Sequence, residues 1–211
     1  MELIGVLAWV SWNTFLAIVP VVLANIIVWL AGLPKRKILK VPVAMLGLVW
    51  LAFLPNTCYL LTEWRHFLFT LDGTDLYLQA RIDSAMTLRL MLHTVFYFCY
   101  SGVGVLTFTL AIRPIARLAK QKGANLWVYT IPLFLMLSIG VYLGLVLRYN
   151  SWDLISRPGE VWESVKTLSR RPALSAFIIV FGGFLWLAYT AVDIWIDGLI
   201  IRWRHLKASR S

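Results

Sequence analysis

The fold is decided first by residues 3–33, which read LIGVLAWVSWNTFLAIVPVVLANIIVWLAGL. A helix rises about 1.5 Å per residue and the hydrocarbon core of a bilayer is about 30 Å thick, so about 20 apolar residues cross it. This run exceeds that length and carries no charged side chain. It lacks the basic start of a signal peptide and continues past the length of a signal's apolar region, so we expect a retained membrane span.

Four further stretches meet the same criterion. They predict an all-α, polytopic transmembrane bundle of about five spans in a single membrane domain, residues 1–211. The predicted spans are 3–33, 41–62, 82–112, 126–147 and 173–201, and residues 158–171 have the amphipathic spacing of a short helix on the membrane surface. Pro20, Pro55 and Pro132 lie inside spans, and the pair Gly140 and Gly144, four residues apart, predicts close helix packing.

Composition agrees with a lipid environment. Hydrophobic residues make up 60% of the chain, charged residues 14%, and the mean hydropathy is +0.77. Soluble domains carry roughly a quarter charged residues. A chain this apolar cannot cover itself with polar surface, so we expect membrane lipid as its main partner.

The positions of the basic residues predict orientation. The net charge is +10, but the excess lies between apolar segments, as expected for membrane topology and not for nucleic-acid binding. Three segments hold basic residues and no acidic ones: Lys35, Arg36, Lys37 and Lys40; Arg113, Arg117, Lys120 and Lys122; and Arg202, Arg204, Lys207 and Arg210. By the positive-inside rule these segments and the C-terminus are cytoplasmic and the N-terminus is outside.

Polar side chains gather towards the predicted outer side. Asn56, Tyr59, Glu63 and His66 form one stripe of the second span, and Pro55 before them leaves the Leu51 carbonyl without its helical partner.

The third span opens with Asp83 and contains Arg89, and the fourth is followed by Arg148, Asn150, Trp152 and Asp153. An ionisable group at membrane depth needs a partner or water, so we expect Arg89 to meet Glu63, Asp83 or Asp153. The pattern predicts an outward-facing polar cup, or alternatively a network that only fixes helix register.

Two motifs carry a resemblance. Residues 53–63 read FLPNTCYLLTE and residues 148–153 read RYNSWD. Together they resemble a bacterial domain-of-unknown-function family of small multi-span membrane proteins, with the pattern Leu-Pro-Asn-x-x-Tyr and Arg-x-Asn-Ser-Trp-Asp. The chain has Glu63 where that family usually has Asp. The resemblance implies a location in a bacterial inner membrane and no particular activity.

Sites of other kinds find little support. Glu63 and His66 have the Glu-x-x-His spacing of bundle metal sites, but the second copy that such sites need is absent, so we assign no metal ligand. His93 is more readily a hydrogen-bonded helix residue than a haem ligand. Cys58 and Cys99 form no disulfide framework. The cofactor stays unknown.

We therefore predict a site that binds a small polar ligand or lipid headgroup. Its arginines hold an anion and its carboxylates set the polarity. The candidate residues are Asn56, Tyr59, Glu63, Asp83, Arg89, Arg148, Asn150, Trp152 and Asp153. Two alternatives stay open: an enzyme acting on lipid or envelope substrates through the same carboxylates, and an accessory subunit with a membrane-protein partner or in a homo-oligomer. No nucleophile with its base stands out to favour the enzyme.

Overall fold

The computed structural model describes residues 3–34, 36–150 and 152–209, and Lys35, Ser151 and Arg210 lie outside them, as does the side chain of His66. The described residues form helices and connections, with no strand among them. The helices are α1 (Leu3–Gly32), α2 (Arg36–Phe53), α3 (Pro55–Thr62), α4 (Trp64–Thr74), α5 (Leu76–Gln79), α6 (Ser84–Gln121), α7 (Leu126–Leu145), α8 (Asp153–Ser156), α9 (Pro158–Ser169) and α10 (Pro172–Ala208).

Five helical segments are long and apolar enough to cross a membrane, which confirms the predicted fold class. They are Leu7–Gly32, Ile38–Phe69, Ser84–Gln121, Val128–Leu145 and Pro172–Ala208. These five segments indicate a multi-pass membrane protein.

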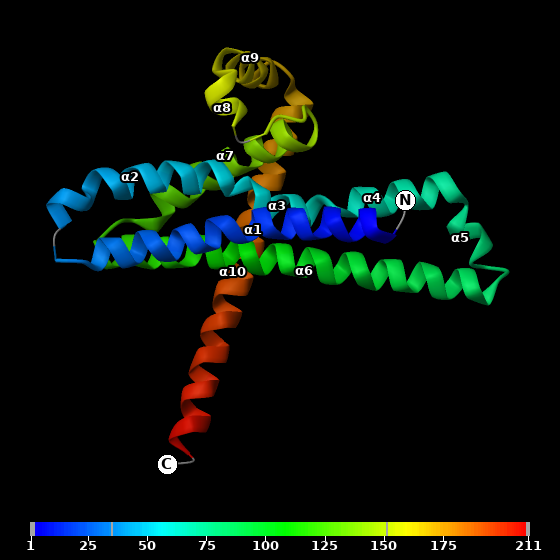
Figure 1. The fold of residues 1–211 in the computed structure, drawn as a ribbon, viewed down its shortest axis with the longest axis horizontal. Helices are drawn as coiled ribbons and strands as arrows, with labels where there is room; N and C mark the ends of the chain where they lie inside the picture. Colours follow the sequence, from blue (N-terminus) through cyan, green and yellow to red (C-terminus); the bar gives the residue numbers. More distant parts are fainter. Residues whose placement is uncertain (1–2, 35, 151, 210–211) are drawn as a thin grey trace.

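The long helices are arranged around α6 (Figure 1). The helices α1, α3 and α6 pack against one another along their lengths, and α7 packs on α3 and α10. In Figure 1, α10 crosses α1 and α6 steeply, and its C-terminal half extends beyond them. The short helices α8 and α9 follow α7, and α9 packs on α7 and α10. The α8–α9 segment therefore covers one side of α7.

The second span is broken at Leu54, where Pro55 begins α3. Proline lacks the N–H that would bond to the carbonyl four residues earlier, so the turn opens. The side chains that follow bond to nearby carbonyls: Asn56 Nδ2 donates to the Phe53 oxygen at 2.9 Å, and Thr57 Oγ1 donates to the Leu54 oxygen at 2.7 Å. The Pro-Asn-Thr sequence thus makes the break and supplies donors to the Phe53 and Leu54 carbonyls within it.

Glycines let α3 lie unusually close to its neighbours. A Cβ at Gly104 would be 2.8 Å from Leu60 Cβ, and one at Gly140 would be 2.8 Å from Pro55 Cγ. A Cβ at Gly144 would be only 1.7 Å from the Tyr59 hydroxyl. The close packing predicted for Gly140 and Gly144 is confirmed, and its partner is the Pro55–Tyr59 face of α3.

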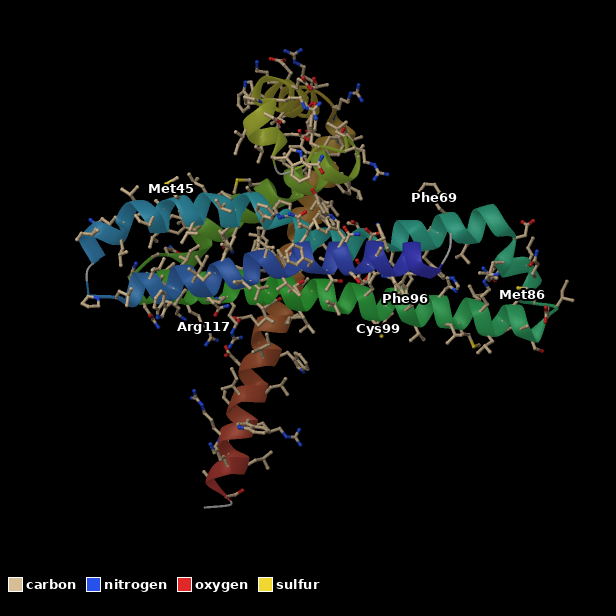
Figure 2. The ribbon with its side chains drawn as sticks, viewed as in Figure 1. Met45, Phe69, Met86, Phe96, Cys99 and Arg117 are labelled. Carbon is tan, nitrogen blue, oxygen red and sulfur yellow. The ribbon has the colours of Figure 1, made fainter. Side chains whose placement is uncertain are left out.

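Large apolar side chains cover the outside of the helices. Met45, Phe69 and Phe96 point away from the bundle in Figure 2, with exposed fractions of 63%, 65% and 39%. The interior is apolar too, with Leu54, Phe108, Phe134 and Leu185 at its centre. Exposed apolar surface of this extent is expected where lipid is the solvent.

The helix α6 continues through the segment that the charge pattern predicts to be a connector. Arg113 lies inside α6, is buried, and donates to the carboxylate of Asp193 at 2.7 Å and to that of Asp197 at 2.6 Å. Arg117 also pairs with Asp197. This charge cluster of Arg113, Arg117, Asp193 and Asp197 joins α6 to α10 (Figure 2). Because the arginines have partners on α10, the helix does not need to end before them.

Candidate functional site

A small hollow brings together residues from three distant parts of the chain. It has a volume of about 70 Å³ and lies between α1, the break before α3, and the segment after α7. We call it the mouth; its lining residues are Trp12, Leu16, Phe53, Asn56, Tyr59, Tyr149, Asn150 and Trp152. Four of the nine predicted site residues therefore line one hollow: Asn56, Tyr59, Asn150 and Trp152.

The helix α3 places two of these side chains. Asn56 and Tyr59 lie three residues apart on α3 and therefore on one face of it. Asn56 is buried and is held by its bond to the Phe53 carbonyl, whereas Tyr59 is half-buried with its ring against Gly144. Bonded and packed in this way, both side chains are fixed before any ligand arrives.

The segment after α7 is shaped by Asp153. This carboxylate is buried and accepts hydrogen bonds from the Asn150 backbone N–H at 2.7 Å and from Arg157 Nη2 at 2.9 Å. The Asn150 N–H bond and the Arg157 guanidinium lower the pKa of Asp153 below its ordinary value. Asp153 therefore ties Asn150 to Arg157 next to the mouth residues Asn150 and Trp152.

The bonds of Asp153 to the Asn150 N–H and to Arg157, called the clamp below, predict that the stability of this segment depends on pH. A carboxylate whose pKa is lower in the folded chain stabilises the fold above its unfolded pKa of about 4, and that stabilisation is lost as the pH falls through the folded pKa. We expect the amide protons of residues 150 and 152–157 to be protected at neutral pH and to lose protection below about pH 4. Hydrogen exchange corrected for its intrinsic pH dependence measures this.

Asp153→Asn provides the control for that measurement. The amide keeps the size of the side chain but has no charge to lose, so this variant should be less protected at neutral pH and should show no transition. Equal protection of the wild-type segment on both sides of pH 4 would contradict the role of the clamp.

Arg148 adopts an unusual backbone conformation. Its φ is +62°, in the left-handed region, and its side chain is exposed. This conformation lets the Tyr149 N–H reach the Leu143 carbonyl at 3.1 Å and end α7. A left-handed residue with a Cβ costs roughly 1–2 kcal/mol, and glycine avoids that cost. An arginine at this position is therefore not explained by backbone geometry.

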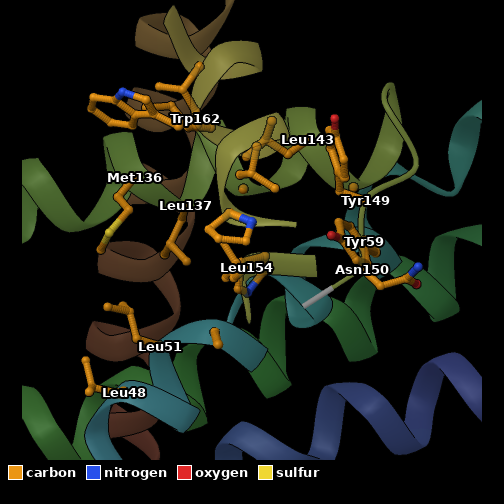
Figure 3. A pocket seen from close by; sticks show the side chains of 18 residues that line it. Leu48, Leu51, Tyr59, Met136, Leu137, Leu143, Tyr149, Asn150, Leu154 and Trp162 are labelled. Atoms are coloured by element: carbon orange, nitrogen blue, oxygen red, sulfur yellow. The ribbon is translucent and has the colours of Figure 1, made fainter. Parts of the chain in front are cut away.

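A larger, apolar cavity opens beside the mouth (Figure 3). Its volume is about 540 Å³, it is lined by α2, α3, α7, α8 and α9, and it is open to the outside where Leu48 and Met136 are 68% and 43% exposed. Tyr59, Tyr149 and Asn150 line both the cavity and the mouth. Figure 3 places these three side chains at one end and Leu48 and Met136 at the other. The two hollows therefore adjoin at these three residues, and the cavity is apolar along the rest of its lining.

The other predicted residues lie elsewhere. Ser101 on α6 is level with Leu60, to whose carbonyl its hydroxyl donates at 3.4 Å. Asp83 is eighteen residues before Ser101, about 27 Å further along the helix. There it caps α6 by accepting from the Ala85 N–H at 2.9 Å. Sequence reasoning placed the start of this span at the level of Asp153, but α6 is too long for that.

Arg89 and Glu63 also line neither hollow. Arg89 is exposed on the second turn of α6, and among the described residues no carboxylate pairs with its guanidinium. A long side chain so close to a helix end can extend to the interface. Glu63 is buried at the junction of α3 and α4, near the phenols of Tyr97 and Tyr100. The expected ion pair between Arg89 and these acids is therefore not formed within the described residues.

Two residues of this region, Tyr149 and Arg157, were not predicted from the sequence. The side chain of Tyr149 lines both hollows, and its hydroxyl lies 3.2 Å from Ser164 Oγ. The guanidinium of Arg157 pairs with the carboxylate of Asp153. The spacing of four between Asp153 and Arg157 was an available signal, as was the matched spacing of Arg113 with Arg117 and Asp193 with Asp197.

The described residues provide no group of side chains that could serve as ligands of a metal ion. Across the described residues, no three His, Cys, Asp or Glu side chains lie close enough together to hold a metal ion. The mouth instead offers amide and phenol groups, with the Arg148 guanidinium next to them in sequence. These groups can bind a polar ligand by hydrogen bonding and charge.

Comparison with known proteins agrees with the resemblance carried by the two motifs. The family model described as "Protein of unknown function (DUF1361)" matches residues 12–188, which include both motifs and every residue of the mouth. No curated protein and no solved structure matches the chain. Since the match covers most of its length, the chain belongs to the DUF1361 family of proteins of unknown function.

Proposed function

We propose that this protein is a multi-pass protein of the bacterial cytoplasmic membrane that binds an anionic, phosphate-bearing headgroup at the mouth. The observation that carries the proposal is the left-handed, exposed Arg148 directly before Tyr149 and Asn150, which line the mouth. Strained residues persist where their side chain has a use. A guanidinium matches a phosphate, and the amides of Asn56 and Asn150, which line the mouth, can supply neutral hydrogen bonds.

Helix length supports a position of the mouth at the membrane surface. The helix α7 has 20 residues and is about 30 Å long, the thickness of the hydrocarbon core. Lys120 and Lys122 precede α7, and the mouth residues Tyr149, Asn150 and Trp152 follow it. The positive-inside rule then places the lysines in the cytoplasm and the mouth outside.

Binding is favoured over catalysis by what the carboxylates do. Asp153 accepts from a backbone N–H and from Arg157, and Asp83 caps α6. An acid–base pair needs two carboxyl groups beside the same ligand, with separated pKa values. Neither Asp83 nor Glu63 lines the mouth, so the described residues offer no such pair there.

Arg148→Gly separates the two roles of this position. Glycine adopts the left-handed conformation without strain, so we expect the free energy of unfolding to stay equal or rise by up to about 1 kcal/mol. The same change removes the cation, and the affinity for butyl phosphate should fall by at least about tenfold. Phosphorus NMR titration and thermal unfolding in detergent measure the two quantities.

Arg81→Ala is the matched control, because Arg81 is exposed, precedes α6 and lines neither hollow. It should leave butyl phosphate binding unchanged. If wild-type protein does not bind butyl phosphate, or if Arg148→Gly binds it as well as wild type, the proposed function is wrong.

A further inference from the structure

The apolar cavity extends the site from the membrane surface towards the middle of the bilayer. Its far end is formed by Leu48 on α2 and Met136 on α7, and its near end by Tyr59 and Asn150. Leu48 lies eleven residues before Tyr59, which is about 16 Å of helix. This is about half the roughly 30 Å thickness of the hydrocarbon core, the depth that one lipid chain reaches.

The lining is apolar everywhere except at the mouth. Leu51, Leu137, Ile139 and Leu143 form walls between the two ends. Of the polar side chains at the near end, the Tyr149 hydroxyl is already bonded to Ser164. A volume of about 540 Å³ falls within the roughly 300–1,000 Å³ that is usual for sites enclosing small molecules. A hydrocarbon chain suits this surface along its whole length, whereas a polar group would lose its hydrogen bonds there.

The helix α9 covers the cavity with its apolar face. Val161 and Val165, four residues apart, line the cavity together with Trp162. Glu163 and Lys166 form an ion pair at 2.8 Å, and both are exposed. The clamp of Arg157 on Asp153 fixes the start of α9, and Arg157 also stacks over the Tyr149 ring at 5.7 Å. Helix α9 is therefore an amphipathic cover that is anchored to the rest of the fold beside the mouth.

We infer that the ligand is amphiphilic, with one hydrocarbon chain in the cavity and its phosphate in the mouth. This rests on the proposed function, since the mouth holds the headgroup. Transfer of a chain from lipid into an apolar cavity yields little free energy, because both surroundings are apolar. The headgroup therefore supplies the anchoring, and the cavity selects a ligand by having room for one chain directly below it.

Two probes with the same headgroup test the inference. Hexadecyl phosphate carrying a diazirine at its chain end is added to the full chain in phosphatidylcholine nanodiscs, and labelled peptides are mapped after illumination. We expect the label on the far end of the cavity, at Leu48, Leu51 or Met136. Competition by unlabelled hexadecyl phosphate or by farnesyl phosphate then distinguishes an acyl-type from an isoprenoid-type chain, and either result supports the inference.

A filling variant and its matched control complete the test. Ala52 lines the cavity, so Ala52→Phe places a ring in it and should lower the labelling by about tenfold while butyl phosphate still binds. Ala44 lies on the same helix but is exposed and outside the cavity, so Ala44→Phe should label like wild type.

Two results would overturn the inference while leaving the headgroup site intact. One is label found on outward residues of α10, such as Ile179 and Val180, and absent from the cavity. The other is equal labelling of the cavity in Ala52→Phe and wild type, with butyl phosphate bound by both. Failure of wild-type protein to bind butyl phosphate would instead remove the proposed function itself.

Discussion

Gly144→Ala is expected to destabilise the protein and to abolish headgroup binding together. The new Cβ would lie 1.7 Å from the Tyr59 hydroxyl and 2.5 Å from its ring carbon Cζ, so either the ring moves or α3 separates from α7. Overpacking of this kind costs about 1–3 kcal/mol, more than the roughly 1 kcal/mol that alanine gains over glycine in a helix. Because Tyr59 lines both hollows, its displacement changes the mouth and the cavity.

Thermal unfolding and butyl phosphate binding in detergent measure this pair of effects. Gly183→Ala is the matched control, since Gly183 is also inside a helix and a Cβ there meets nothing within 4 Å. In a double-mutant cycle, Tyr59→Ala should recover much of the stability lost in Gly144→Ala, because the clashing ring is gone. If Gly144→Ala unfolds and binds like wild type, the α3–α7 contact is looser than described.

Arg113→Leu is expected to lower the free energy of unfolding by about 3 kcal/mol. The buried Arg113 guanidinium bonds to the Asp193 and Asp197 carboxylates and to the Asp193 carbonyl. Its removal leaves Asp193 without a cation and Asp197 with Arg117 alone. An acid left unpaired inside the bundle is costly, whereas the loss of an exposed pair is not.

Arg117→Ala tests that difference. Because the Arg117 side chain is half exposed, its removal should lower the free energy of unfolding by less than about 1 kcal/mol. Arg113→Lys should fall between the two, since an ammonium group cannot bridge both carboxylates in the manner of a guanidinium. Reversible unfolding in detergent provides the free energies. Equal costs for Arg113→Leu and Arg117→Ala would contradict the buried role of Arg113.

Apolar runs predicted the five-span class because the bilayer thickness imposes a length on every span. The same reasoning placed the end of the third span at Ile112, before Arg113, because an isolated arginine favours the interface. Only the tertiary contact with Asp193 and Asp197 explains why α6 continues to Gln121. A pattern within one helix cannot reveal which other helix will neutralise its charge.

The grouping of residues at the mouth was predictable where they are close in the sequence, and not where it depends on their depth in the membrane. Asn56 and Tyr59 share a helix face, and Asn150 and Trp152 lie two residues apart, so their grouping follows from short spacings. Asp83 and Arg89 were expected beside them because the outer ends of the spans were assumed to be level. The apolar cavity was not predicted at all, since its walls consist of leucines that any span contains.

The unequal lengths of α6 and α7 relate the protein to the membrane that it enters. The helix α6, with 38 residues, is about 57 Å long, nearly twice the length of α7. A bilayer that matches α7 leaves α6 to tilt or to project beyond the headgroups, and each adjustment has a cost that depends on bilayer thickness. Hydrophobic mismatch therefore makes lipid chain length a variable that acts on this fold, and thinner or thicker bilayers should shift the level of the mouth relative to the headgroups.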